Sequence, residues 1–447
     1  MSRRRIGWNL ASTTYDKLVI AAVQLALVPL LAHGWGVPLY GCWVLLTAVP
    51  GFLALGDLGF GGAAFARMTA LVARGERDEA VVVLHTARQV VALACVVLAI
   101  VTTMAIWAVP ASWLPLAPGL SATAARIVLE LMLVYTVTIL LGALQFAGFA
   151  SIGLIAVANL ITTHMFLLES ALLALAVLTG HGPVAGAAAM ATGRLVGNIV
   201  KVLWLRRTAP WMTWGLARAS GAERRLLARS AASMLAVPLS QATALQGTVM
   251  VLGLAAGPAA TPAFAATRTL SRIGLQATQL LTRAVMPEFA RAQAQGDGRG
   301  QAAMLLAVCG LALALALPFA MFIAAGGDWL LRVWTGGAVT APRGLMPVMA
   351  VSILLGGLWN PLSTLMIAID RQAVFAWAYL GFATLSLLVT YLLAPTLGPT
   401  AGAVGFGALD GCMALIVGRF AWQHWLRGLP MREVARSAVG RLRRRAG

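Results

Sequence analysis

Five long polar side chains recur at helical spacing within one apolar stretch of the sequence, near residues 262–287. Successive members are separated by four, four, three and four residues: Arg268, Arg272, Gln276, Gln279 and Arg283. On a helix of about 3.6 residues per turn they share one narrow sector and form a polar stripe about 22 Å long. Guanidinium groups bind phosphate or carboxylate oxygens in pairs, so the stripe predicts an anion-binding wall. The alternative is structural pairing, with snorkelling for Arg283 near the end of the stretch.

A second stretch, 184–205, carries the same kinds of side chain. Arg194, Asn198 and Lys201 lie at positions i, i+4 and i+7 and therefore share one face of a helix. Arg194 is near the middle of the stretch and is a second candidate for anion binding, whereas Lys201 is close enough to the end to snorkel. Lys17, in the first apolar stretch of the chain, is either a further substrate-binding residue or an interfacial one.

Four carboxylates inside apolar stretches are candidates for coupling transport to a proton or cation gradient, because an intramembrane charge is costly and needs a reason. They are Asp57, Glu130, Glu169 and Asp410. Glu169 lies in the middle of its stretch, where it either titrates or serves as the counter-ion of Arg194 on the next helix. Asp57 and Asp410 have glycine neighbours, so a role at a helix end or in close helix packing is the alternative for both.

The composition shows what kind of scaffold must position these residues. Of 447 residues, 60% are hydrophobic and only 11% are charged, whereas soluble domains carry roughly 25% charged residues. A helix needs about 20 apolar residues to cross the hydrocarbon core, which leaves room for about twelve spans. The apolar runs are continuous rather than alternating, so they favour helices over a β-barrel. We predict an all-α integral membrane protein with spans near 15–35, 39–63, 86–109, 124–146, 152–178, 184–205, 231–255, 262–287, 303–325, 344–367, 374–394 and 400–422.

The net charge is +19, and most of the arginines lie in clusters between the spans, without the interleaved aromatic residues of a nucleic-acid site. Basic clusters occupy the N-terminus, the second, sixth and eighth loops and the C-terminal tail, while the first and eleventh loops have none. The ninth loop, with Arg332 and Arg343, is an exception. By the positive-inside rule both termini are cytoplasmic, which requires an even number of spans and agrees with twelve. We expect a phospholipid bilayer, and no nucleic acid, as the partner.

The two halves of the chain resemble each other. Residues 65–67 and 289–291 are both Phe-Ala-Arg, each after the second span of its half, and a Trp-Leu pair follows the third span at 113–114 and 329–330. This register predicts two six-helix bundles in the same orientation around a central cavity that opens alternately to either side. The predicted domains are an N-terminal bundle, a basic cytoplasmic linker, a C-terminal bundle and a basic cytoplasmic tail, at 1–205, 206–230, 231–425 and 426–447.

The sequence contains no constellation of residues for catalysis or cofactor binding. The five histidines are scattered, and none is paired with a cysteine or an acidic residue at metal-ligand spacing. Nucleotide-binding loops and hydrolase motifs are also absent. We therefore expect neither a metal nor a cofactor, and no enzymatic activity.

Short motifs are spread over nearly the whole chain. They are Asn9 before a span with Leu27-Val28-Pro29-Leu30-Leu31, then Tyr40-Gly41-Cys42-Trp43, Asp57-Leu58-Gly59, Met286-Pro287-Glu288-Phe289, Leu330-Leu331-Arg332-Val333-Trp334 and Ile369-Asp370-Arg371. With these motifs the chain resembles the polysaccharide and O-antigen flippase family, which transports lipid-linked oligosaccharides. That family is part of the multidrug/oligosaccharidyl-lipid/polysaccharide exporter superfamily.

This resemblance implies two six-helix bundles that face a basic central cavity. It also implies the class of substrate that the cavity binds. The substrate would be an undecaprenyl-pyrophosphate-linked oligosaccharide, flipped from the cytoplasmic to the periplasmic leaflet of the bacterial inner membrane during surface polysaccharide biosynthesis. Its diphosphate would bind Arg194, Arg268 and Arg272, and other polysaccharide-assembly membrane proteins are expected partners. One alternative is a cation-coupled multidrug or small-molecule exporter of the same superfamily, which should favour an acidic cavity. Another is a different membrane class, such as a polymerase, a ligase or a scaffold, although the loops are short for an enzyme.

Overall fold

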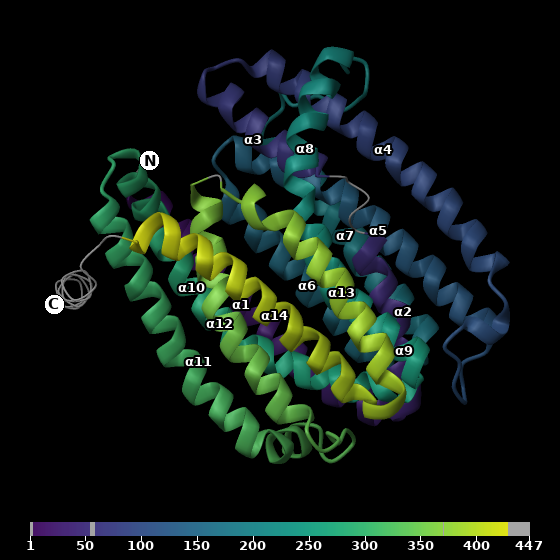
Figure 1. The fold of residues 1–447 in the computed structure, drawn as a ribbon. Coiled ribbons are helices and arrows are strands. Elements are labelled where there is room, and N and C mark those ends of the chain that lie inside the picture. Colours follow the sequence, from purple (N-terminus) through teal and green to yellow (C-terminus); the bar gives the residue numbers. More distant parts are fainter. Residues whose placement is uncertain (1–2, 54–58, 370, 428–447) are drawn as a thin grey trace. The chain divides into compact units, whose positions relative to one another are not determined.

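The chain folds almost entirely into helices (Figure 1). The computed structural model describes residues 3–53, 59–369 and 371–427, and this part contains fourteen α-helices and no β-strand. Helices suit a chain that lies in lipid, because each one satisfies its own backbone hydrogen bonds. The all-α membrane architecture predicted from the sequence is confirmed.

Ten helical segments of the described residues are long and apolar enough to cross a membrane. Two other long helices are not among them: α7 (Pro183–Thr208) and α10 (Thr261–Ala294). Their lengths of 26 and 34 residues suffice to span a bilayer, but both carry the basic and amide side chains singled out above. The helices least able to face lipid on all sides are therefore those that hold the predicted anion-binding residues.

The helices form two compact units, Met1–Ala242 and Thr243–Gly447. Unit 1 contains α1 (Arg3–Gly34), α2 (Gly36–Leu53), α3 (Phe60–Ala73), α4 (Arg77–Ala108), α5 (Ala122–Ser151), α6 (Ile155–Leu178), α7 and α8 (Gly221–Ala242). Helix α5 is its centre and packs against α2, α3, α4, α6 and α7. Helices α6 and α7 pack closely against each other, and α1 packs against α6. This arrangement brings the polar faces of α5, α6 and α7 together.

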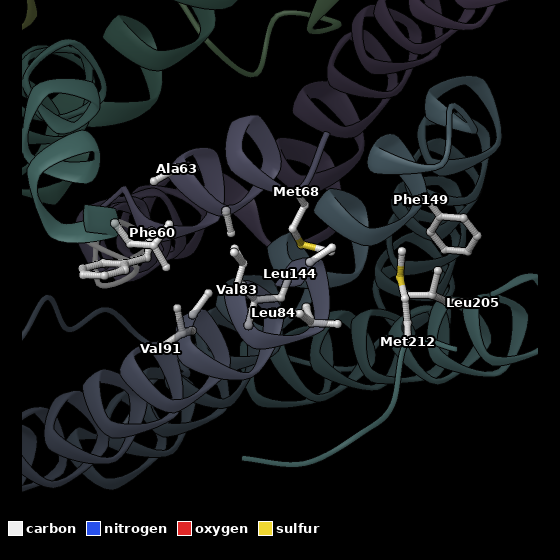
Figure 2. Close-up of a cluster of buried hydrophobic side chains, with 14 of the residues drawn as sticks. Phe60, Ala63, Met68, Val83, Leu84, Val91, Leu144, Phe149, Leu205 and Met212 are labelled. Carbon is white, nitrogen blue, oxygen red and sulfur yellow. The ribbon is translucent and has the colours of Figure 1, made fainter. Parts of the chain in front are cut away.

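A cluster of buried hydrophobic side chains joins α3, α4, α5 and α7 (Figure 2). Met68 of α3, Leu84 of α4 and Leu144 of α5 are no more than 2% exposed. The cluster extends to Phe149 near the end of α5 and to Leu205 near the end of α7. Since lipid tails are as apolar as these side chains, close packing must hold such helices together within a membrane.

The connection between α7 and α8, residues 209–220, folds back onto α4. Arg88 of α4 donates from Nη1 to the carbonyl oxygen of Gly215 at 3.2 Å, and its guanidinium lies 4.3 Å from the ring centroid of Trp214. Arg206, near the end of α7, lies 5.0 Å from the same ring. The basic residues of this segment therefore belong to unit 1, because aromatic and backbone contacts attach them to it.

Unit 2 contains η3 (Thr243–Gly247, a π-helical turn), α9 (Thr248–Ala256), η4 (Pro258–Ala260), α10, α11 (Gly298–Trp334), α12 (Leu345–Ala368), α13 (Ala373–Leu397), α14 (Pro399–Ala421) and η5 (Trp422–Leu426). Helix α12 is its centre and packs against α10, α11 and α14, while α13 packs against α9 and α14. Glycines allow the close approach of α14: a Cβ at Gly405 would lie 2.7 Å from the carbonyl oxygen of Ser386.

The predicted span 39–63 differs from the structure, in which α2 ends at Leu53 and α3 begins at Phe60. Gly59 stands immediately before α3 with φ 79° and ψ 3°, a left-handed conformation that ends helical continuity at this point. A Cβ at Gly59 would lie 2.6 Å from the carbonyl oxygen of Ala231 in α8. Only glycine allows both this backbone conformation and this contact.

Gly59→Ala should therefore destabilise the protein more than Gly75→Ala. Gly75 has a similar φ of 84°, but a Cβ there meets nothing within 4 Å. Both substitutions incur the cost of a left-handed alanine, about 1–2 kcal/mol. Gly59→Ala should add about 1–3 kcal/mol because of the steric conflict with α8. The thermal unfolding midpoint of the purified protein in detergent measures this difference, and equal losses for the two variants would contradict the contact with Ala231.

Candidate functional site

A buried ion pair between Glu169 of α6 and Arg194 of α7 dominates the interior of unit 1. Arg194 Nη2 donates to Glu169 Oε1 at 2.5 Å. The side chains are only 1% and 11% exposed for Glu169 and Arg194. Of the two roles that the sequence leaves open for Glu169, the geometry of unit 1 supports the counter-ion of Arg194.

Tyr135 of α5 completes a triad with this ion pair. Its hydroxyl group accepts a hydrogen bond from Arg194 Nη2 at 2.7 Å and donates one to Glu169 Oε1 at 3.2 Å. The guanidinium carbon of Arg194 also lies 4.9 Å from the centroid of the Tyr135 ring. The tyrosine thus binds the cation with both its hydroxyl oxygen and its ring, which reduces the cost of a buried charge.

Two glycines in α7 allow α6 to approach closely enough for this ion pair. A Cβ at Gly193 would lie 2.8 Å from the Cα of Glu169, and a Cβ at Gly197 would collide with the side chain of Met165. The glycines lie one turn apart, next to Arg194 and Asn198. Small residues at a helix interface bring backbones together, and here they bring opposite charges into contact.

Two other residues of the predicted face of α7 are also buried in unit 1. Asn198 donates from Nδ2 to the carbonyl oxygen of Thr138 at 2.6 Å, and Lys201 is only 4% exposed. Lys201 interacts electrostatically with both Glu169 and Arg194. The cluster therefore combines two cationic side chains with one carboxylate. Within the described part of the chain, Glu169 Oε2, Arg194 Nε and Asn198 Oδ1 have no hydrogen-bond partner.

Lys17, the third predicted basic residue of unit 1, forms an ion pair with Asp16 rather than with Glu169. Its ammonium nitrogen is 3.3 Å from the carboxylate of Asp16, and the two side chains are 31% and 21% exposed. Asp16 in turn accepts a hydrogen bond from Thr163 of α6 at 2.8 Å. Lys17 is therefore part of the polar contact between α1 and α6.

In unit 2, the stripe of α10 begins with an arginine that is bound to the backbone. Arg268 donates from Nη1 to the carbonyl oxygen of Leu245 at 2.6 Å, and its guanidinium lies 5.8 Å from the ring of Phe264. Leu245 belongs to the π-helical turn η3, where the wider backbone is a common mark of functional segments. Arg268 therefore fixes α10 to the irregular segment before α9.

Arg272, one turn further along α10, is exposed. Among the described residues, no hydrogen bond or ion pair engages its guanidinium, although it interacts electrostatically with Tyr379 of α13. Gln276 and Gln279 are half-buried on the same face of the helix. The side chain of Arg283 lies outside the described part of the structure.

The carboxylates predicted for ion coupling differ in their surroundings. Asp410 of α14 is 9% exposed, and its Oδ1 accepts a hydrogen bond from Trp359 Nε1 of α12 at 2.8 Å. The ring of Trp359 contacts Tyr379 edge-on, with the centroids 5.2 Å apart. Glu130 uses both oxygens, which accept bonds from Thr103 at 3.0 Å and Trp107 at 3.2 Å. Asp57 lies outside the described residues.

The structure thus brings Glu169, Arg194, Asn198 and Lys201 into one cluster in unit 1. The residues that sequence reasoning missed are aromatic: Tyr135 in unit 1, and Trp359 and Tyr379 in unit 2. Their hydroxyl and indole groups inside apolar spans were a signal, because a buried Tyr or Trp needs a hydrogen-bond partner. Among the described residues, no group of three or more His, Cys, Asp or Glu side chains could hold a metal ion.

Solved structures of transporters share this architecture. An inward-facing multidrug resistance MATE family transporter of the MOP superfamily aligns with a TM-score of 0.68 at 16% identity, over 90% of this chain and 97% of that chain. An outward-facing structure of such a transporter aligns with a TM-score of 0.62 at 16% identity, over 94% and 97% of the two chains. A MOP superfamily transporter from Pyrococcus furiosus Vc1 aligns with a TM-score of 0.59 at 14% identity, over 94% and 93%.

The chain has the fold of the MOP superfamily transporters. These neighbours are transporters rather than enzymes, and they have been captured in inward-facing and outward-facing conformations. The Pyrococcus protein is described as having a binding pocket of reversed polarity that suggests a different function. Neither a protein-family profile nor a curated protein sequence matches the chain. The MOP fold therefore stands on three-dimensional similarity, in agreement with the superfamily that the sequence motifs resemble.

The buried ion pair predicts an ordered set of stabilities. Glu169→Met leaves two buried cations without a carboxylate and should destabilise the protein by about 3–5 kcal/mol. Arg194→Met should cost less, because Lys201 remains as a counter-charge for Glu169. The double variant should be more stable than Glu169→Met, since it removes one of the two uncompensated cations. Unfolding in mixed micelles measures the three free energies, and strictly additive losses would show that the two side chains are not coupled.

Proposed function

We propose that the protein is a transporter that moves an amphiphilic anion across a membrane by alternating access, with Arg272 binding the anionic head group. The observation that carries this proposal is that Arg272, an exposed residue on a helix of membrane-spanning length, has no ion-pair partner among the described residues. A cation at such a position is costly, and the binding of an anion supplies its counter-charge.

The surroundings of Arg272 suit a phosphorylated ligand. A guanidinium offers a planar pair of donors that matches two phosphate oxygens, and it stays charged throughout the physiological pH range. Gln276 and Gln279 follow on the same face and can donate to phosphate or accept from sugar hydroxyl groups. Arg268 anchors the beginning of this face through its bond to Leu245. Arg194 has a different role in our proposal, because Glu169 already neutralises its charge.

The substrate that fits best is a lipid-linked oligosaccharide diphosphate, flipped from the cytoplasmic to the periplasmic leaflet of a bacterial inner membrane for surface polysaccharide synthesis. The resemblance of the sequence motifs to polysaccharide and O-antigen flippases supports this choice, and so does the basic character of the stripe in α10. In this proposal the diphosphate binds Arg272, the sugars follow the amide side chains, and the lipid tail stays in the bilayer. Other polysaccharide-assembly membrane proteins would act before and after it.

A multidrug exporter is the second candidate, because two of the similar structures are multidrug resistance transporters. A cationic drug requires an exposed acidic group for recognition. Within the described residues, Glu169 pairs with Arg194, Glu130 uses both oxygens in hydrogen bonds, and Asp410 is buried rather than exposed. The polarity of the described residues therefore favours an anionic substrate.

Arg272→Gln should reduce transport about tenfold to a hundredfold, because the charged hydrogen bonds to a phosphate are lost. The measurement is surface glycan restored in a flippase-deficient bacterium that carries the cognate glycan gene cluster, at matched membrane levels of protein. Arg299→Gln is the control, since Arg299 is also exposed but lies outside the stripe.

Failure of the wild-type chain to restore glycan would contradict the flippase proposal, and drug-resistance assays in the same strain would then test the second candidate. Restoration by wild type and Arg272→Gln alike would leave the flippase proposal standing and remove Arg272 from the anion site.

Asp410 is the coupling carboxylate in our proposal, because it is buried without an ion-pair partner among the described residues, whereas Glu169 pairs with Arg194 and Glu130 uses both oxygens in hydrogen bonds. Asp410→Asn keeps the acceptor for Trp359 but removes the titratable charge. In proteoliposomes this variant should still flip a lipid-linked diphosphate, but without the acceleration that an imposed proton or sodium gradient gives the wild type. Glu130→Gln should keep the acceleration, and the same loss in both variants would argue against a specific role for Asp410.

A further inference from the structure

An apolar groove runs along the outside of unit 1 where α6 and α7 meet. Its volume is about 440 Å³, and residues of these two helices alone line it. On α6 the lining includes Val157, Ile161, His164 and Leu168, which recur at steps of four, three and four residues. These positions form a single stripe along the helix. The lining residues therefore follow the axis of α6.

The wall on α7 is a second stripe, formed by Val196, Val200 and Trp204. It lies on the side of α7 opposite to the buried charges, since Val196 follows Arg194 by two residues and about 200° of helical rotation. Gly197 and Met165 form the floor between the two stripes. Because Gly197 lacks a side chain, Met165 can lie deep between the helices and leave the groove open above it.

Arg207 continues the stripe of α7 beyond the groove. It follows Trp204 by three residues, so it lies on the same face, near the end of the helix. Arg207 is exposed, and no hydrogen bond or ion pair engages it within the described residues. The guanidinium of its neighbour Arg206 instead contacts the ring of Trp214 in the connection between α7 and α8. The lining of the groove is thus apolar except for His164, whose Nδ1 bonds to the carbonyl oxygen of Leu160, and Arg207 makes one end cationic.

The position of the groove along the helices matches one leaflet of a bilayer. Its lining residues span 157–168 in the first half of α6 and 196–204 in the second half of α7, and these halves are adjacent because the helices are antiparallel. Because α6 is long and apolar enough to cross a membrane, we expect the cationic end at the level of the lipid head groups and the apolar part toward the middle of the membrane.

We propose that this groove binds an anionic phospholipid of the surrounding membrane, with one acyl chain between α6 and α7 and its phosphate at Arg207. The chain would cover the apolar stripes, and the phosphate would supply the counter-charge that Arg207 lacks. Such a lipid would bind to the outside of the interface that holds the Glu169–Arg194 ion pair. This site is independent of the proposed transport function and of Arg272.

Native mass spectrometry of the full-length, delipidated protein in detergent tests the proposal, with phosphatidylglycerol and phosphatidylcholine as probes. The wild type should bind one phosphatidylglycerol more tightly than phosphatidylcholine. Arg207→Gln should weaken this binding about fivefold, the equivalent of about 1 kcal/mol for one arginine near the membrane surface. Arg206→Gln is the matched control and should leave it unchanged, because Arg206 contacts Trp214 instead.

A second pair of variants tests the groove itself. Val200→Trp fills it and should remove the tightly bound lipid, whereas Ile199→Trp places the same bulk on an exposed neighbouring position outside the lining. Equal binding of the two phospholipids, equal effects of the two arginine variants or unchanged binding by Val200→Trp would each overturn the proposal. Preferential binding of a polyprenyl phosphate at this site would also overturn it, because the groove would then belong to the substrate.

Discussion

An ionised side chain in hydrocarbon has a high free-energy cost, and the rest of the structure depends on avoiding that cost. In unit 1 this cost is reduced by the ion pair of Glu169 and Arg194, completed by Tyr135. The pair exists only because Gly193 and Gly197 let α6 and α7 approach closely. Helix α7 consequently has an inverted pattern, with charges facing the protein interior and aliphatic side chains facing outward, as a helix in lipid requires.

The two units treat buried charge differently. Unit 1 pairs Glu169 with Arg194 and buries Lys201 beside this ion pair, so its charged groups interact with one another. Unit 2 separates its charges: Arg268 is bound to a backbone carbonyl group, Arg272 is exposed, and Asp410 is buried against Trp359. An internally paired charge is already compensated, whereas an unpaired one is available to a ligand. Our functional proposals therefore assign substrate and coupling ion to unit 2, and a supporting role to the ion pair of unit 1.

The fold places limits on function without choosing a substrate. Transporters described as multidrug resistance proteins share it with a protein whose pocket polarity is described as reversed. Substrate specificity among proteins with this fold therefore depends on the side chains at the binding site and not on the fold itself. In this chain α7 and α10 are the two long helices of the described residues that are too polar to count as simple membrane spans, and our functional proposal places substrate binding on α10.

The sequence by itself determined the all-helical membrane class and the shared faces of Arg194, Asn198 and Lys201, because hydropathy and helical period are local properties. The close approach of α6 and α7, and the choice of Arg194 as the partner of Glu169, were decided by tertiary structure. Tertiary structure also decided the hydrogen bond between Tyr135 and Arg194, because the two residues are 59 positions apart in the sequence. Helical spacing shows which side chains share a face, but only the packing of neighbouring helices decides which of them find a partner and which, like Arg272 and Arg207, remain available.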